Sequence, residues 1–235
     1  MIGIIGAMPV EIEGLRSIMD NRRDKVFSGV TFSSGTISGA EVTLAVSGVG
    51  KVMASMCATA MCVCFSPSLV INTGVAGSLS PELSVGDILV AEALAQHDFD
   101  TGAIDGTPRG WIGAFNGVLL PADGTAAQIL CGAAAGCGIK ASKGIIVSGD
   151  QFIADAAVKD DLRRTFGASA CEMEGAAIAA VSAVNSIPFA VLRAVSDSAD
   201  GGAAENFPAF CRRSAENSIK VLTRALPSLN DIFSA

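Results

Sequence analysis

Only 17% of the 235 residues are charged, so a carboxylate inside an apolar stretch is unusual and is a candidate for chemistry. The segment CEMEGAA at 171–177 places Glu172 and Glu174 among small and apolar residues. Glu11 follows the apolar run IGIIGAM at 2–8, and Asp197 ends the run FAVLRAVSD at 189–197. A carboxyl group in apolar surroundings can have a raised pKa and act as a general acid or base. These four carboxylates are therefore the first candidates for catalysis or ligand binding.

Each of these carboxylates also has a structural interpretation. Glu11 and Glu13 fit the first turn of a helix, where a negative charge interacts favourably with the helix dipole. We assign Glu13 to that role. Asp197 fits the N-cap of a following helix equally well. The roles of Glu11 and Asp197 therefore stay open until the whole pattern is considered.

The remaining motifs are weaker. His97 is the sole histidine, and no G-x-S-x-G segment supplies a serine nucleophile, so a structural or interface role is favoured over an acyl-hydrolase triad. SGVGK at 47–51 lacks the third glycine of the dinucleotide fingerprint and the spacing of a P-loop. Its glycines are expected to form a tight turn or to admit a small uncharged ligand. The seven cysteines show no paired metal-ligand spacing, so we expect reduced core thiols and no metal.

The elements that would position these residues alternate along the chain. Apolar runs rich in Val and Ile predict buried strands at 2–8, 42–51, 69–77, 85–98, 143–152 and 189–200. Helical spacing or high Ala content predicts helices at 9–19, 51–64, 125–135, 175–184 and 207–226, the last with Asn206 as N-cap. This alternation predicts an α/β fold with a largely parallel sheet and a ligand site at the carboxyl ends of its strands. Residues 99–124 show no periodicity and are expected to form a long, functional loop.

Composition limits the function classes. A net charge of −7 and no cluster of Lys or Arg argue against nucleic-acid binding. The apolar run at 52–65 is shorter than the ~20 residues that span a membrane, and the chain starts without the basic segment of a signal peptide. We therefore expect a cytoplasmic protein with one domain over residues 1–235. Its 50% hydrophobic content also predicts a homo-oligomer.

The motifs taken together resemble one family. GIIGAM with Glu11, SGVGK, INTGVAG, VGDI, HD, IVSGDQFI, EMEGAA and RAVSDSAD occur in the order and spacing of the 5′-methylthioadenosine/S-adenosylhomocysteine nucleosidases, in the nucleoside phosphorylase and hydrolase superfamily. The resemblance extends to about residue 210. It implies a three-layer α/β/α subunit with a twisted mixed sheet, a homodimer, and no metal or cofactor. It also implies hydrolysis of the bond between adenine and a 5′-thioribose, in methionine salvage and the recycling of S-adenosylmethionine by-products.

The same resemblance implies residue roles. Asp197 would protonate adenine N7, Glu11 would activate water, and Glu174 would accept from the ribose hydroxyls. Around the purine, the resemblance implies Phe152 stacked on the ring, the Ile153 backbone at its edge, and Ala76 and Gly77 beside it. Met173 would contact the ribose, Arg193 would lie near the water, and Ser196 would orient Asp197. The alkylthio group would be surrounded by Met8, Val49 and Phe207, and by Thr101 and Ile104 from the second subunit. Glu172 is expected in a supporting role, paired with Arg193. Val75 departs from the family, which commonly has Ser there, and this puts the water network in question.

Elementary chemistry favours hydrolysis over phosphorolysis. Glycosidic cleavage needs an acid on the leaving group and a base on the attacking water, and Asp197 and Glu11 can supply both. A phosphorylase must instead hold a phosphate dianion, usually with Arg and backbone N–H groups. Glu11 would repel that anion. A purine nucleoside phosphorylase and a non-catalytic adenosine-binding protein remain as alternatives, and the sequence does not rank 5′-deoxyadenosine or aminodeoxyfutalosine against the thioether substrates.

Overall fold

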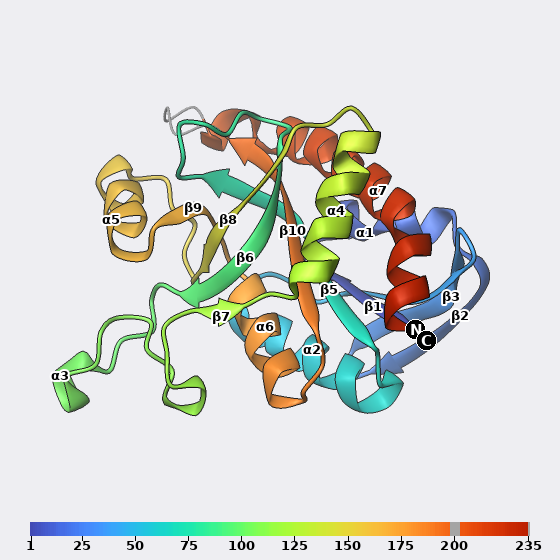
Figure 1. Cartoon of the computed structure of the whole chain (residues 1–235), viewed down its shortest axis with the longest axis horizontal. Helices are drawn as coiled ribbons and strands as arrows, with labels where there is room; N and C mark the ends of the chain where they lie inside the picture. Colours follow the sequence, from blue (N-terminus) through green and yellow to red (C-terminus); the bar gives the residue numbers. More distant parts are fainter. Residues whose placement is uncertain (198–202, 235) are drawn as a thin grey trace.

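The computed structural model describes the backbone of residues 1–197 and 203–234 and the side chains of residues 1–196 and 212–234. Its strands are β1 (Ile2–Gly6), β2 (Asp20–Phe27), β3 (Val30–Ile37), β4 (Ala40–Val46), β5 (Leu69–Ser78), β6 (Ile88–Gln96), β7 (Leu120–Pro121), β8 (Ala141–Ser148), β9 (Ala168–Glu172) and β10 (Phe189–Asp197). Its helices are α1 (Pro9–Ser17), α2 (Lys51–Phe65), α3 (Gly102–Asp105), the 3₁₀ turn η1 (Gly113–Phe115), α4 (Gly124–Gly136), α5 (Ala156–Phe166), α6 (Gly175–Val184) and α7 (Ala203–Phe233). The expected α/β class is confirmed (Figure 1).

The strands form one mixed sheet in the order β10-β6-β8-β9-β5-β1-β4-β3-β2, and β7 pairs with β6. Strand β10 also pairs with β5, so β5, β10, β6, β8 and β9 close into a ring. The length of β5 makes this closure possible. Its first residues pair with β1 and its last two, Gly77 and Ser78, pair antiparallel with β9. The pairing of Gly77 with Cys171 brings the end of β9 beside the carboxyl end of β5.

Helices cover both faces of the sheet, as the three-layer prediction requires. Helices α1, α4 and α7 pack over one face, where Ile2 and Ile4 of β1 point. Helices α2 and α6 pack over the other face, which receives Ile5. Successive strand residues therefore enter opposite layers, and this is why the buried strands read as continuous apolar runs.

The predicted helices are present, and only α7 differs from its predicted bounds, 207–226, by more than two residues at an end. One prediction is wrong: α7 begins at Ala203, so Asn206 lies inside the helix and is not its N-cap. The hairpin β2–β3 and helix α5 were not predicted. Strand β2 is polar and exposed along most of its length, so it carries no apolar alternation. Asp155 is the N-cap of helix α5, and its carboxylate accepts from the N–H groups of Ala157 and Val158.

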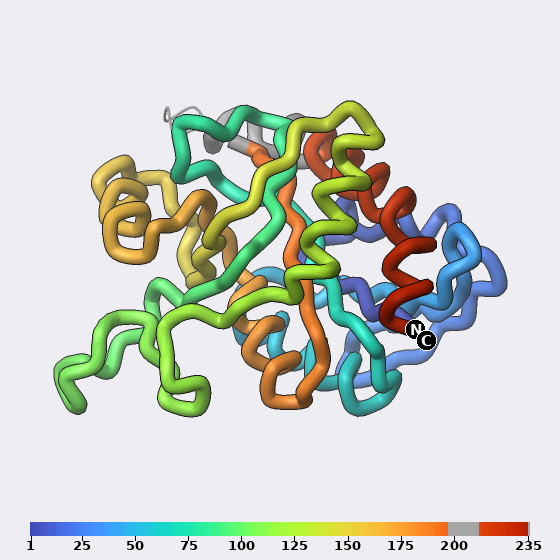
Figure 2. The backbone as a smooth tube through the Cα atoms, in the orientation of Figure 1, coloured from blue at the N-terminus to red at the C-terminus, as the bar shows by residue number. Residues whose placement is uncertain are grey.

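The segment at 99–124 is the expected excursion. It contains only the short elements α3, η1 and β7, and α3 lies well away from the sheet (Figure 1). The two chain ends lie side by side at the opposite side of the molecule (Figure 2). The Met1 amino group donates to Ser234 Oγ at 3.1 Å. Among the described residues, no helix is long and apolar enough to cross a membrane.

Candidate active site

A cavity of about 200 Å³ lies where the turns after β1, β4 and β8 meet the ends of β5, β9 and β10. The sequence-predicted residues that line it are Met8, Glu11, Val49, Ala76, Gly77, Phe152, Ile153, Glu172, Met173, Glu174 and Ser196. Ala7, Val75, Gln151 and Cys171 complete the described lining. Most of the lining is apolar, with carboxylates at a few positions. This is the composition of a small-molecule site.

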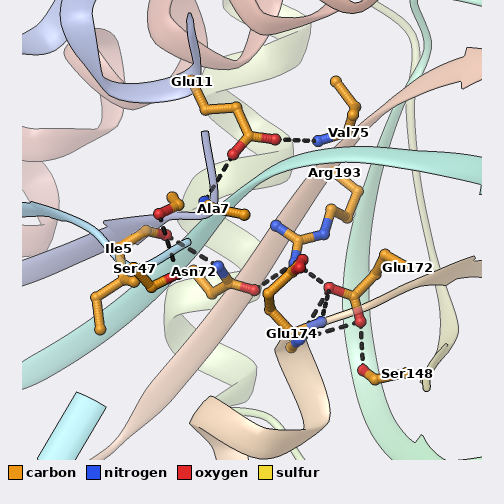
Figure 3. A network of polar contacts seen from close by, with 12 residues as sticks. Ile5, Ala7, Glu11, Ser47, Asn72, Val75, Ser148, Glu172, Glu174 and Arg193 are labelled. Carbon is orange, nitrogen blue, oxygen red and sulfur yellow. Dashed lines mark hydrogen bonds and ion pairs between the residues drawn. The ribbon is translucent and has the colours of Figure 1, made fainter. Parts of the chain in front are cut away.

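Glu11 is held at one end of the cavity by backbone groups. Its Oε2 accepts from the N–H groups of Ala7 at 2.7 Å and Met8 at 2.8 Å, and its Oε1 accepts from the Val75 N–H at 3.1 Å (Figure 3). Two of these contacts arise locally, because Glu11 is the third residue of α1 and reaches back to the start of its own helix. The third ties it to β5. Glu11 is thus both a cap of α1 and a fixed cavity carboxylate.

Burial raises the pKa of Glu11 above its ordinary value, although the Arg193 charge and the three backbone bonds act in the opposite direction. The side chain is only 4% exposed. A general base works best when its pKa approaches the working pH, so this shift suits proton abstraction from water. The hydrogen bonds meanwhile keep the carboxylate in one orientation.

Gly74 allows Glu11 and Arg193 to approach β5. A Cβ at this position would lie 2.6 Å from Glu11 Oε1 and 2.8 Å from Arg193 Nη1. Contacts this short are not tolerated between non-bonded heavy atoms, so a side chain here would displace one of the two groups. The glycine of INTG is therefore required by the site.

Arg193 is the central cation of the site and is 1% exposed. Its Nη2 donates to Asn72 Oδ1 and to Glu172 Oε2, and it lies 3.8 Å from Glu174 Oε2 (Figure 3). Burial lowers the Arg193 pKa, but the charges of Glu172, Glu174 and Glu11 outweigh burial and raise it overall. The guanidinium therefore stays charged and offsets part of the repulsion among three carboxylates.

Glu172 has its carboxylate occupied by protein groups. Besides the Arg193 pair, it accepts from Ser148 Oγ, from the Glu174 N–H at 3.1 Å, and from the Gly175 N–H at 2.8 Å to Oε2. These N–H groups belong to the first turn of α6, where a carboxylate is favoured. The expected pair with Arg193 is present. The contacts explain Glu172 as the group that joins β9, α6 and β10, and leave it little capacity for a ligand.

Glu174 is the less occupied of the two neighbouring glutamates. Its Oε1 accepts from the Gly50 N–H at 2.9 Å, and its Oε2 faces Arg193 at a distance longer than a hydrogen bond. Burial, followed by the Glu172 charge, raises the pKa of Glu174 to about 7. Both glutamates line the cavity, Glu172 as the last residue of β9 and Glu174 just before α6. Glu174 retains the capacity to accept from a ligand hydroxyl.

Four predicted site residues need separate placement. Asp197 pairs through its backbone with the cavity residue Gly77, but its side chain and that of Phe207 lie outside the described residues. Thr101 and Ile104 do not line the described cavity. Ile104 is 89% exposed at the tip of the excursion.

Asn72 and Ser148 support the site through hydrogen bonds, and the sequence patterns assigned a role to neither. Asn72 is buried, donates to the Ile5 carbonyl at 2.9 Å and accepts from Arg193. Ser148 is buried, donates to Glu172 and accepts from the Ala176 N–H at 2.7 Å. A detectable signal existed for Asn72, since an amide inside an otherwise apolar strand must find buried partners.

Comparison with known proteins gives the same assignment. The model of the phosphorylase superfamily matches residues 1–227. The 5′-methylthioadenosine/S-adenosylhomocysteine nucleosidase of Anoxybacillus flavithermus is 37% identical, with 97% of this chain and 99% of the relative covered.

Solved structures agree with the sequence relatives. The nucleosidase of the same name from Neisseria meningitidis, in complex with methylthio-immucillin-A, has a TM-score of 0.92 at 36% identity, covering 97% of this chain and 99% of the other. A futalosine hydrolase of Helicobacter pylori has a TM-score of 0.91 at 36% identity, with 97% of each chain covered. The chain therefore belongs to the phosphorylase superfamily and, as an N-glycosyl hydrolase, to the family of 5′-methylthioadenosine/S-adenosylhomocysteine nucleosidases.

Proposed function

We propose that this enzyme hydrolyses the N-glycosidic bond of 5′-methylthioadenosine and S-adenosylhomocysteine, with Glu11 as the base for water and Asp197 as the acid at adenine N7. The observation that carries the proposal is the environment of Glu11. Its carboxylate is fixed by three backbone N–H groups at one end of the cavity. Among the described residues, no Lys or Arg lines that cavity, and the buried Arg193 behind it already faces carboxylates.

This charge distribution suits hydrolysis. As the bond between the sugar C1′ and adenine N9 breaks, positive charge develops on the ribose, and nearby carboxylates stabilise it. Glu11 takes a proton from the water whose oxygen bonds to C1′, and Asp197 gives a proton to N7 so that adenine leaves neutral. A phosphate dianion in the place of this water would meet Glu11 without a compensating cation.

The remaining roles follow from position. Glu174 accepts from the ribose hydroxyls with the oxygen that faces Arg193, beside Met173. Phe152 is 54% exposed and lines the cavity, where its ring would stack on the purine, and the adjacent Ile153 would present its backbone to the purine edge. Met8 and Val49 offer an apolar wall that suits a thioether better than a hydroxyl or phosphate.

Incubation with 5′-methylthioadenosine in phosphate-free buffer tests the reaction. We expect release of adenine and 5-methylthioribose, followed by absorbance and chromatography. A requirement for phosphate, with formation of a ribose 1-phosphate, would identify a phosphorylase. Thermal stabilisation by the nucleoside without any turnover would identify a binding protein.

Glu11→Gln tests the role of the base. This variant keeps acceptor and shape but cannot take the proton, so kcat should fall by about 10²- to 10⁴-fold while binding is largely retained. Asp197→Asn should give a similar loss for want of N7 protonation. Near-normal kcat in either variant would refute the assignment.

We further propose that two copies form a homodimer through the outer sides of α2 and α6, with Ile104 and Thr101 completing the partner's alkylthio pocket. The support is exposure: Val52 is 77% exposed, Val63 70% and Val184 69%, all on these helices. Light scattering after size-exclusion chromatography tests the oligomeric state. Ile104→Ala should raise KM for 5′-methylthioadenosine, and a monomer with unchanged KM in this variant would refute the proposal.

The 5′ substituent sets the substrate range. The related futalosine hydrolase and the nucleosidases share this fold at similar identity, so fold alone does not rank substrates. Measurement of kcat/KM for 5′-methylthioadenosine, S-adenosylhomocysteine, 5′-deoxyadenosine and aminodeoxyfutalosine ranks them. The apolar wall predicts the methylthio substrate above 5′-deoxyadenosine.

A further inference from the structure

Three charged residues near the cavity have no role in the proposed reaction, yet they meet in one network. Lys51 Nζ donates to Asp98 Oδ1 at 2.5 Å. Asp98 Oδ2 accepts from the Asp150 N–H at 2.8 Å, and Asp150 Oδ1 accepts from the Lys51 N–H at 2.7 Å. The bonds return to the residue where they start, so this network, the Lys51–Asp98–Asp150 clamp, fixes three segments against one another.

The three segments come from distant parts of the sequence. Lys51 is the first residue of α2, Asp98 follows the end of β6, and Asp150 lies in the turn between β8 and α5. A further contact, from Lys51 Nζ to Gln96 Oε1 at 3.2 Å, attaches the lysine to β6 itself. The Lys51 and Asp98 side chains are 16% and 20% exposed, so their attraction is screened less than that of a surface pair.

The clamp is next to Glu174, the glutamate proposed to bind the ribose, through a single hydrogen bond from Gly50. Gly50 immediately precedes Lys51, and its N–H donates to Glu174 Oε1 at 2.9 Å. The position of that N–H depends on Asp150, because α2 has no capping side chain of its own and Asp150 supplies the acceptor at its first turn. A Cβ on Gly50 would lie 3.1 Å from Asp150 Oδ1, so the Asp150 carboxylate lies close to the Gly50 backbone.

The clamp also holds the segment proposed to bind the purine. Phe152 and Ile153 follow Asp150 by two and three residues and line the cavity. The start of the same turn is fixed by the Gly149 N–H, which donates to the Glu172 carbonyl at 3.2 Å. The His97 ring lies against Gly149, where a Cβ would be 2.3 Å from His97 Nε2. Asp98 therefore bonds to a turn that packs against His97 at one end and lines the cavity at the other.

We propose that Asp98 is a positioning residue of the nucleosidase reaction: through Lys51 and Asp150 it fixes the purine-binding turn relative to the Gly50 N–H that orients Glu174. The proposal rests on the roles given above to Phe152 and Glu174. Both contacts exist before and during bond cleavage, so loss of the clamp weakens ground-state and transition-state binding together. Such a loss raises KM with little change in kcat.

Asp98→Asn is the central variant, because it removes the charge and keeps the shape. We expect KM for 5′-methylthioadenosine and the inhibition constant of adenine to rise about 5- to 20-fold, with kcat changed less than about threefold. Lys51→Met should give the same pattern. The double variant should be little worse than either single one, because the two residues act through one interaction.

Two further variants serve as the negative and positive controls for Asp98→Asn. Asp24→Asn removes an exposed ion pair of similar length, 2.6 Å to Arg22, on the outer hairpin, and it should leave both constants unchanged. Phe152→Ala should weaken adenine directly, because it removes the stacking ring.

The outcomes separate the hypotheses. Unchanged KM and adenine inhibition in Asp98→Asn, with a weakened Phe152→Ala, would overturn the clamp proposal alone. A lower kcat with unchanged KM and inhibition, together with a lower unfolding midpoint, would show a merely structural role and also overturn it. Unchanged adenine inhibition in Phe152→Ala would overturn the purine-binding role and the clamp proposal with it.

Discussion

Gly74→Ala is the sharpest test of the site's geometry, because its effect follows from two distances. The new methyl carbon would lie 2.6 Å from Glu11 Oε1 and 2.8 Å from Arg193 Nη1. Ordinary contact begins at 3.4 Å, so the Glu11 oxygen must move by roughly 0.8 Å. That oxygen accepts from the Val75 N–H at 3.1 Å, and the displacement breaks or bends this bond.

The expected effect is on catalysis more than on binding or stability. A misplacement of about 1 Å in a catalytic group can cost about 10²-fold in rate, so we expect kcat to fall by about that factor. KM should change less, because the three atoms nearest to the new methyl carbon belong to Glu11 and Arg193 and none to Phe152, Met173 or Glu174. Overpacking should lower the free energy of unfolding by about 1–3 kcal/mol.

The assay is steady-state release of adenine together with urea unfolding. Gly132→Ala is the matched control, because a Cβ there meets no atom within 4 Å in the exposed part of α4. It should leave kcat unchanged and raise stability by about 0.5–1 kcal/mol. A folded Gly74→Ala enzyme with kcat within about threefold of the wild type would refute the proposed role of the Glu11 position.

Three further predictions concern the buried carboxylates. Burial raises the pKa of Glu174 from 4.5 to about 7, so its contribution to stability is present below pH 4.5 and is lost as the pH rises to about 7. At pH 8, Glu174→Gln should therefore be more stable than the wild type by on the order of 2 kcal/mol. At pH 4 the two proteins should be equally stable, and urea titrations at both pH values measure the difference. The raised pKa of Glu11 places the acidic limb of the kcat/KM profile above pH 4.5, and a limb below that value would contradict ionised Glu11 as the base. Ser148→Ala should lower the free energy of unfolding by about 1–3 kcal/mol in urea, because it leaves the buried Ala176 N–H unpaired. Ser182→Ala on α6 is the control: its hydroxyl has no partner among the described residues, so the free energy of unfolding should not change.

The order of strands and helices could be predicted because burial leaves a periodic trace in the sequence. Strand β1 reads as an apolar run because both its faces are buried, and α2 and α6 read as helices from their length and composition. The hairpin β2–β3 left no such trace, because β2 is exposed along most of its length and its first six residues are polar. The closure of β10 onto β5 was not predictable either, since it depends on the length and curvature of strands and not on their composition.

The candidate site was predicted mainly where residues end strands. Glu172 and Ser196 lie at or next to such ends, Glu11 lies in the first turn of the helix after β1, and all three line the cavity. The rule used for the prediction covers parallel strands, yet β9 runs antiparallel to β5 and still delivers Glu172, because the ring turns its end inward. The SGVGK glycines were expected to form a tight turn or to admit a small ligand. The bond from the Gly50 N–H to Glu174 was not predicted, because a backbone N–H has no residue-type signal.

The proposed roles of Glu11, Glu172 and Glu174 follow from the number of protein partners that each carboxylate has. Glu172 is bound by Arg193, Ser148 and the first turn of α6, so its charge serves to hold the segments together. Glu11 is bound by three N–H groups, which fix its orientation in the cavity, as its proposed role as the base for water requires. Glu174 has one N–H partner, so it has the greatest capacity to accept from a ligand. Three carboxylates beside one guanidinium leave the site with excess negative charge, and this charge would stabilise the positive charge that develops on the ribose. The same imbalance disfavours a bound phosphate, and hydrolysis follows from it.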